Sequence, residues 1–351
     1  MKKQFKVFVG GLGIFSVLLA ICLSACGPAA KPGDQAITIR LGYRPKALAD
    51  VTPVIIKEMK VARAGVRVEL VPVPSPTEAM QRLNAGELDA VAGIPLASIL
   101  TQMETESPHF VAYYHQADVA GEGWVSLVVN KNMGVQQILD LAGKPCAALP
   151  TDQAKWLLRR ILVAAGVPTQ SVNIVVYNPL TPVAGLEAKE HAAIFGLEPA
   201  ISSATLRGHK VLAKGPVSQY LYDGKPVIVS SSLLSKSFVL EHPSAYRSFL
   251  SMVDEAVMIA AENPGAVRSL FTTRDYGELS KDEADRLFMP VMMPPSEELR
   301  STCIQYVDDL VRDGLLATRV DLTPLFPELI PISNESANES EHTEAGQVLS
   351  P

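Results

Sequence analysis

Short apolar or alternating runs, separated by stretches with helical spacing, recur along the chain. Residues 37–42 and 66–70 alternate apolar and polar positions, and residues 88–94 are a nearly continuous apolar run, so all three predict strands. Residues 50–61 predict a helix, and the capping sequence at 75–78 opens a second one. Strand, helix, strand, helix, strand with short connections predicts a parallel sheet with helices on both faces.

The same pattern returns after residue 123. It predicts strands at 124–130, 146–149, 172–177 and 191–196, with helices at 135–141, 153–165 and 183–188. After a last strand at 226–230, the spacing predicts helices at 243–261, 266–271, 280–288 and 297–316. The fold class is therefore α/β, with two lobes around a ligand cleft and a hinge at 118–123.

Composition shifts divide the chain further. We predict a signal peptide at 1–25, a linker at 26–35, a first lobe from 36–118 with 224–326, a second lobe from 119–223, and a disordered acidic tail at 327–351.

The N-terminus predicts the compartment. Lysines at positions 2, 3 and 6 precede an apolar run at 7–21, and Leu23-Ser24-Ala25-Cys26 follows. This order resembles the lipobox of bacterial lipoproteins, which implies that Cys26 becomes a lipidated N-terminus. The alternative is an uncleaved anchor helix, since 7–23 is barely long enough to span a membrane. Either way, the protein is expected in the cell envelope, held on a membrane and facing the extracytoplasmic side.

Charge and cysteine content narrow the chemistry. The net charge of −6 and the lack of a basic stripe argue against nucleic acid as a partner. Cys146 and Cys303 either form a disulfide or remain buried thiols. The histidines lack the spacing of metal ligands, and no motif of hydrolases or phosphate-binding loops is present, so we predict neither a metal nor another cofactor.

Four stretches together carry a family resemblance. Residues 79–94, 138–148, 192–199 and 238–266 occur in the order found in the extracytoplasmic substrate-binding lipoproteins of ABC importers. The chain resembles the branch that handles nitrate, taurine and other sulfonates, and thiamine precursors. The resemblance implies a type II-like periplasmic-binding-protein fold that closes on a small molecule and docks, as a monomer, on an ABC permease and ATPase complex. It implies no enzymatic activity and leaves the ligand open.

Ligands of α/β sheets bind outside the carboxyl ends of the strands, which selects a set of loops. The candidate ligand-binding residues are Tyr43, Arg44, Ile94, Pro95, Ser98, Trp124, Thr151, Asp152, Gln153 and Glu198. Arg44 is either an anion-binding group or a surface arginine, and Glu198 either a ligand contact or a structural carboxylate. Asp152, as a potential cap of the helix that follows, and Glu198, as a potential acceptor from an amine or hydroxyl, favour a neutral or amine-bearing heterocycle over a small oxyanion.

Two rival functions remain open. The periplasmic-binding fold also hosts biosynthetic enzymes, which would need an acid–base pair in the cleft. A lipoprotein that senses a ligand and docks on a receptor would have the same sequence features as an import protein.

Overall fold

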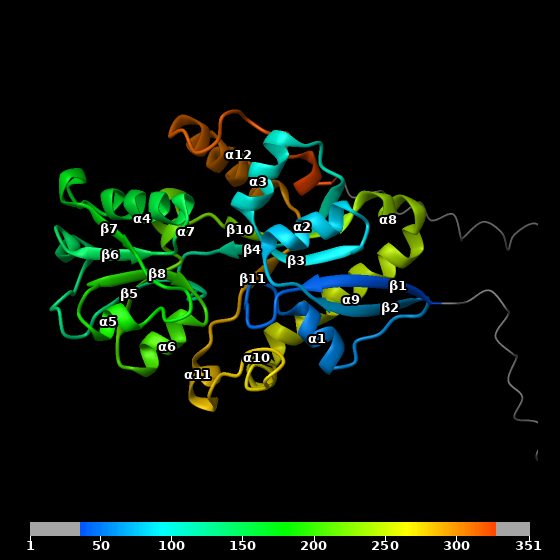
Figure 1. Ribbon diagram of the computed structural model, residues 1–351, viewed down its shortest axis with the longest axis horizontal. Coiled ribbons are helices and arrows are strands. Elements are labelled where there is room, and N and C mark those ends of the chain that lie inside the picture. Colours follow the sequence, from blue (N-terminus) through cyan, green and yellow to red (C-terminus); the bar gives the residue numbers. More distant parts are fainter. Residues whose placement is uncertain (1–35, 328–351) are drawn as a thin grey trace, which may run out of the picture.

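The computed structural model describes residues 36–327, which form a mixed α/β fold with two sheets side by side (Figure 1). The predicted signal peptide with Cys26, the linker and the acidic tail from residue 328 lie outside the described residues. Between residues 36 and 327, no helix is long and apolar enough to cross a membrane.

The first lobe is built on a six-stranded sheet in the order β11-β4-β10-β3-β1-β2. Its strands are β1 (Ile37–Tyr43), β2 (Val66–Pro72), β3 (Ala90–Pro95), β4 (Phe110–Asp118), β10 (Val227–Ser235) and β11 (Val291–Met293). Strand β1 pairs in parallel with β2 and β3, whereas β10 is antiparallel to β3 and β4.

The second lobe is built on a five-stranded sheet in the order β7-β6-β8-β5-β9. Its strands are β5 (Val125–Val129), β6 (Pro145–Ala148), β7 (Asn173–Val176), β8 (Ala193–Leu197) and β9 (Lys210–Lys214). Strand β6 is parallel to β7 and β8, and β5 is antiparallel to β8 and β9. The expectation of purely parallel sheets was therefore wrong. Strand β5 follows directly from the first lobe and β10 follows directly from the second, and each runs antiparallel to its neighbours.

Helices cover both sheets. They are α1 (Thr52–Glu58), α2 (Pro76–Asn84), α3 (Leu96–Thr105), α4 (Asp152–Ala164), α5 (Ala184–Glu187), α6 (Ala200–Leu206), α7 (Pro216–Leu221), α8 (Lys236–Glu241), α9 (Pro243–Glu262), α10 (Pro264–Leu270), α11 (Lys281–Arg286) and α12 (Glu297–Arg312), with 3-10 turns η1 (Ile138–Leu141), η2 (Thr169–Ser171) and η3 (Thr323–Leu325). The helix expected at 135–141 is only the turn η1. The sequence pattern did not reveal α3, β4, α6, β9, α7, α8 or β11.

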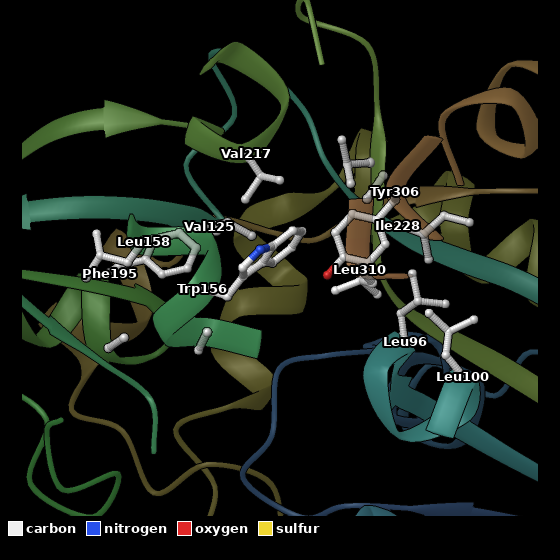
Figure 2. Packing of buried hydrophobic residues seen from close by; sticks show 14 of the residues in the cluster. Leu96, Leu100, Val125, Trp156, Leu158, Phe195, Val217, Ile228, Tyr306 and Leu310 are labelled. Atoms are coloured by element: carbon white, nitrogen blue, oxygen red, sulfur yellow. The ribbon is translucent and has the colours of Figure 1, made fainter. Parts of the chain in front are cut away.

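Helix α12 lies between the lobes rather than on one of them (Figure 1). Figure 2 shows Tyr306 and Leu310 of α12 between Trp156 of α4 and the Leu96 and Leu100 side chains of α3. The rings of Trp156 and Tyr306 are 5.8 Å apart in an edge-to-face arrangement. The two lobes therefore share one apolar cluster on this side of the molecule.

Polar contacts fix α12 on the second lobe. Arg160 on α4 donates to Asp309 at 2.6 Å, and the Tyr222 hydroxyl donates to the same carboxylate at 3.0 Å. The Trp156 indole donates to Asp313 at 2.8 Å. The assignment of all of 224–326 to the first lobe stays a prediction, but α12 contacts the helices of both lobes.

A candidate ligand cavity between the lobes

A cavity of about 360 Å³ lies between the loop after β1 and the carboxyl ends of β6, β7 and β8. It is lined by Arg44, Ala47, Leu48, Ala49, Trp124, Leu149, Tyr177, Pro179, Leu180, Pro182, Leu197, Glu198, Pro199, Ala200 and Ser203. The residues from Arg44 to Ala49 belong to the first lobe. Trp124 ends the segment that connects β4 to β5, and the remaining residues belong to the second lobe. The volume is within the range typical of small-molecule sites, and the location is the one expected for α/β sheets.

Arg44 lies on the first-lobe wall of the cavity. Its Nη2 donates to the Gly93 carbonyl oxygen at 3.1 Å, while its Nε is buried without a hydrogen-bond partner in residues 36–327. Burial lowers the pKa of the guanidinium. Arg44 is therefore a partly buried cation in the cavity wall and not the surface arginine that the sequence left as an alternative.

Trp124 joins the two lobes at the cavity. It precedes β5 and is 2% exposed, and its indole Nε1 donates to the Leu48 carbonyl oxygen at 3.0 Å. Leu48 belongs to the loop that carries Arg44. The indole therefore sets the position of the first-lobe loop against the second lobe.

Glu198 lies on the opposite wall, but both of its oxygens are already engaged. Oε2 accepts from the backbone N–H of Ser202, and Oε1 accepts from that of Phe288, each at 3.0 Å. Burial raises the pKa of this carboxyl to about 7, an effect that the two N–H donors partly offset. Phe288 lies between α11 and β11, so Glu198 connects the second lobe to the chain returning to the first.

Several lining residues were missed by sequence reasoning. Tyr177 directly follows β7, and Leu149 directly follows β6, so the strand-end rule applied to every predicted strand would have found both. No sequence pattern indicated residues 179–182 or Ser203 as lining a ligand cavity. They belong to a proline-rich loop and to the first turn of α6, which line the cavity only in the folded second lobe.

The other predicted ligand contacts do not line this cavity. Tyr43 packs against Tyr276, with ring centroids 6.3 Å apart, and Ile94, Pro95 and Ser98 lie at the junction of β3 and α3. Their role in binding stays a prediction.

The start of α4 is occupied by its own contacts. The cap of this helix is Thr151, whose hydroxyl accepts from the Ala154 N–H at 3.2 Å. Asp152 instead pairs with Lys155 at 2.6 Å on the surface, and Gln153 donates to the Tyr306 hydroxyl. The part of the argument against an anionic ligand that rested on Asp152 as a cap therefore loses its basis. Binding by these three residues stays a prediction.

Within the described range, no three His, Cys, Asp or Glu side chains gather in a way that could hold a metal ion. Cys146 and Cys303 are both buried free thiols, and burial raises the pKa of each to about 12. The disulfide considered from the sequence does not form between them. No cysteine or histidine is among the cavity-lining residues.

The sequence matches the NMT1-like family over residues 33–272. The chain belongs to the NMT1-like family. A search of curated protein sequences finds no match for this NMT1-like chain. The family assignment made from the four sequence stretches is thereby confirmed, together with the two-lobed fold class described above.

Solved structures share the fold of this NMT1-like protein. The periplasmic aliphatic sulphonate binding protein SsuA from Escherichia coli superposes with a TM-score of 0.64 at 17% identity, over 83% of this chain and 92% of that one. The periplasmic nitrate-binding protein NrtA from Synechocystis PCC 6803 gives 0.59 at 16% identity, over 80% and 83%. DszB, an enzyme, solved with biphenyl-2-sulfinic acid, gives 0.59 at 14% identity, over 84% and 97%.

Proposed function

We propose that this NMT1-like chain is a lipid-anchored, extracytoplasmic solute-binding protein that captures a small organic solute between its lobes and delivers it to an ABC importer. The observation that carries the proposal is the cavity itself. Its walls come from both lobes, with Arg44 in the loop after β1 and Trp124 directly before β5. The fold shared with SsuA and NrtA, which are binding proteins, supports the same function.

The proposed mechanism is closure of the lobes on the solute. Strand β4 leaves the first sheet at Asp118 and β5 enters the second at Val125, so a short crossing separates the sheets. A second crossing leads from α7 to β10. Rotation about these crossings would move the second-lobe wall toward the loop of Arg44 and exclude water from the cavity.

Tryptophan fluorescence tests the capture of a solute. The chain has two tryptophans, so Trp156→Phe leaves Trp124 at the cavity as the single reporter. We expect a solute that binds by calorimetry to change the fluorescence of this variant. The matched variant Trp124→Phe keeps only Trp156, which packs on α12, and should not respond even at solute concentrations that saturate this variant by calorimetry. A response of Trp156 alone, or calorimetric binding that survives obstruction of the cavity by Ala200→Trp, would refute the proposed site.

The anchor and the delivery step need separate experiments. We expect the full chain, but not Cys26→Ser, to incorporate radiolabelled palmitate and to sediment with membranes. Deletion of the gene should abolish uptake of the bound solute by cells, and restoration by the wild type but not by Cys26→Ser would support both steps. Unchanged uptake in the deletion strain would contradict delivery to an importer.

An enzyme is the second candidate function, because DszB shares the fold. The lining of the cavity offers Glu198 and Tyr177 as its acid–base groups, but both Glu198 oxygens accept backbone hydrogen bonds. We therefore expect a bound solute to be recovered unchanged by mass spectrometry after prolonged incubation. Recovery of a stoichiometric excess of product would favour the enzyme.

A further inference from the structure

The loop between β1 and α1 forms the first-lobe wall of the cavity, and it is held from both lobes. The Leu48 carbonyl oxygen accepts from the Trp124 indole, directly before the second lobe begins at β5. Further along the same loop, the Asp50 carboxylate accepts from the Ser232 hydroxyl on β10 of the first lobe. Because so little chain separates the two contacts, the position of Asp50 constrains the position of the Leu48 carbonyl.

Asp50 is buried, and hydrogen bonds engage both of its oxygens. The Thr52 N–H and hydroxyl donate to Oδ1 at 2.8 and 2.7 Å, and the Ser232 hydroxyl donates to Oδ2. Burial raises the pKa of Asp50, and the bonds from Ser232 and Thr52 lower it in part. The Thr52 bonds are local to the start of α1. Ser232 is therefore the partner that attaches this carboxylate to the sheet.

The direction of the Ser232 bond is set by the other groups around its hydroxyl. The Gly93 N–H and the Gln116 side-chain amide both donate to the hydroxyl oxygen, each at 3.0 Å. A hydroxyl has two acceptor positions and one proton, so the proton is directed to Asp50. The orientation of the Gln116 amide is itself fixed, because its Oε1 accepts from the Ser230 hydroxyl at 2.7 Å.

The backbone of β3 supports the loop at the same place. Gly93 on β3 has a φ of 63°, and a Cβ built there would lie 2.8 Å from the Ala49 Cβ and 3.1 Å from the Asp50 nitrogen. The loop therefore lies directly on the backbone of the residue whose N–H donates to Ser232. Strands β4 and β10, which supply the other members of this network, are also the strands that connect the first lobe to the second.

We propose that Ser232 and Asp50 are positioning residues of the solute site, whose hydrogen bond holds the wall at 47–49 where the Trp124 indole reaches the Leu48 carbonyl. This inference rests on the proposed solute-binding function. Neither residue is among those that line the cavity, so both act through the loop and not by contact with the solute. A wall that is already in place lowers the entropic cost of binding, because the loop does not have to be ordered by the solute.

The fluorescence of Trp124 reports the position of the wall without any solute. In the full chain carrying Trp156→Phe, we expect Ser232→Ala to shift the Trp124 emission to longer wavelength and to increase its quenching by acrylamide. The physical reason is that a displaced loop removes the carbonyl acceptor of the indole and admits water. An unchanged emission in a folded Ser232→Ala variant would overturn the inference.

Ser231→Ala is the matched control. Ser231 is the neighbouring residue on β10 and is as deeply buried as Ser232, but its hydroxyl contacts His115 at 2.8 Å. The other ring nitrogen of His115 contacts the Leu325 carbonyl, away from the cavity loop. We expect Ser231→Ala to lower the melting temperature without shifting the Trp124 emission. Equal shifts in the two serine variants would show a general loosening of the sheet and would contradict a positioning role.

Asp50→Asn tests the hydrogen-bond direction. Its amide nitrogen would face either the Ser232 hydroxyl, whose acceptor positions are filled, or the Thr52 donors, so two donors meet in either orientation. We expect the same Trp124 shift as in Ser232→Ala and no further shift in the double variant, whereas additive shifts would contradict a shared role. If Ser232→Ala does not fold, Ser232→Cys, whose thiol is a weak donor, should shift the emission less and in the same direction.

Calorimetry connects the wall to binding, with benzenesulfonate, nitrate and 4-aminopyrimidine as probes. We expect every probe that binds the wild type to bind Ser232→Ala roughly 3- to 30-fold more weakly and Ser231→Ala normally. Normal affinity in Ser232→Ala would overturn the positioning role and leave the proposed function intact. Failure of all three probes to bind the wild type would count against the proposed function, while the fluorescence comparison would still decide whether Ser232 holds the wall.

Discussion

The indole Nε1 of Trp124 donates a hydrogen bond to the backbone carbonyl of Leu48, 3.0 Å away, across the boundary between the two lobes. The bond joins the entry of the second lobe to the loop that carries Arg44, and both residues line the cavity. Because both partners are buried, the bond fixes the loop where solvent cannot replace it.

Removing that donor should weaken both the fold and the site. Trp124→Phe deprives the Leu48 carbonyl of its indole donor and shortens the cavity wall, so we expect a loss of about 1–3 kcal/mol in the free energy of unfolding and weaker solute binding. Urea denaturation and calorimetry measure the two effects. Trp156→Phe is the matched control, because it loses a comparable indole bond to Asp313 away from the cavity. It should lose stability but bind normally; reduced binding in both variants would contradict a specific role for Trp124.

A second prediction concerns the attachment of α12 to the second lobe. Asp309 is buried and accepts from Arg160 and Tyr222, so Asp309→Ala leaves both donors without their partner. We expect a loss of about 2–4 kcal/mol in urea denaturation. Asp308→Ala, one residue earlier, removes a carboxylate whose partner Arg319 is 72% exposed, and should cost less than about 1 kcal/mol. Equal losses would mean that the buried cluster adds nothing to the attachment.

Much of the fold could be predicted because its strands are short apolar runs bounded by turn residues. The strand expected at 37–42 is β1, and the helix expected at 243–261 is α9 with a one-residue difference. The segment 96–118 was missed, because α3 is amphipathic over only ten residues and β4 mixes Tyr, His and Gln in a strand buried on both faces. The His115 and Gln116 side chains are satisfied by Ser231 and Ser230, more than 100 residues away in sequence, which no local pattern reveals.

The site was predictable only in part for a related reason. Strand ends selected Arg44 and Glu198, and the hinge selected Trp124, and all three line the cavity. That they contact a ligand stays a prediction. The same rule also selected residues at the start of α4, which do not line the cavity. Helix α12 packs against this end of α4, and the sequence does not show that contact. Gln153 bonds to Tyr306 of that helix, 153 residues later in the chain. The cavity lies beside α6 and the proline-rich loop at 179–182 instead.

A third prediction concerns Gly215, which precedes α7 near the hinge. Its φ is 61°, and a Cβ at this position would lie 1.9 Å from the Val119 carbonyl oxygen. Gly215→Ala must therefore displace the crossing between the lobes, and we expect a loss above about 3 kcal/mol or no folded protein. Gly224 has a similar φ of 79°, but a Cβ there would meet nothing within 4 Å beyond its chain neighbours, so Gly224→Ala should cost only about 1–2 kcal/mol. Comparable thermal stabilities of the two variants would contradict the steric argument.

The last prediction concerns Asp118, the final residue of β4. Its Oδ2 accepts from the Ser218 N–H at 2.9 Å at the start of α7, while Oδ1 is buried and has no partner within residues 36–327. Burial raises the pKa of this carboxyl from 3.8 to about 7. Glu198 has its pKa raised to about 7 for the same reason.

The sign of the pH dependence follows from proton binding. Between about pH 4 and pH 7, the native protein holds a proton on Asp118 that the unfolded chain has released, so the free energy of unfolding falls as the pH rises through this window. Above about pH 7 both states are ionised and the loss is complete. Asp118→Asn keeps an acceptor for Ser218 without the charge. From about pH 5 to about pH 8 its stability relative to the wild type should therefore rise by on the order of 2 kcal/mol, as measured by urea denaturation. Glu198 is present in both proteins, so its contribution to the pH dependence cancels in the comparison. If the stability difference between variant and wild type is the same at both pH values, Asp118 is ionised throughout.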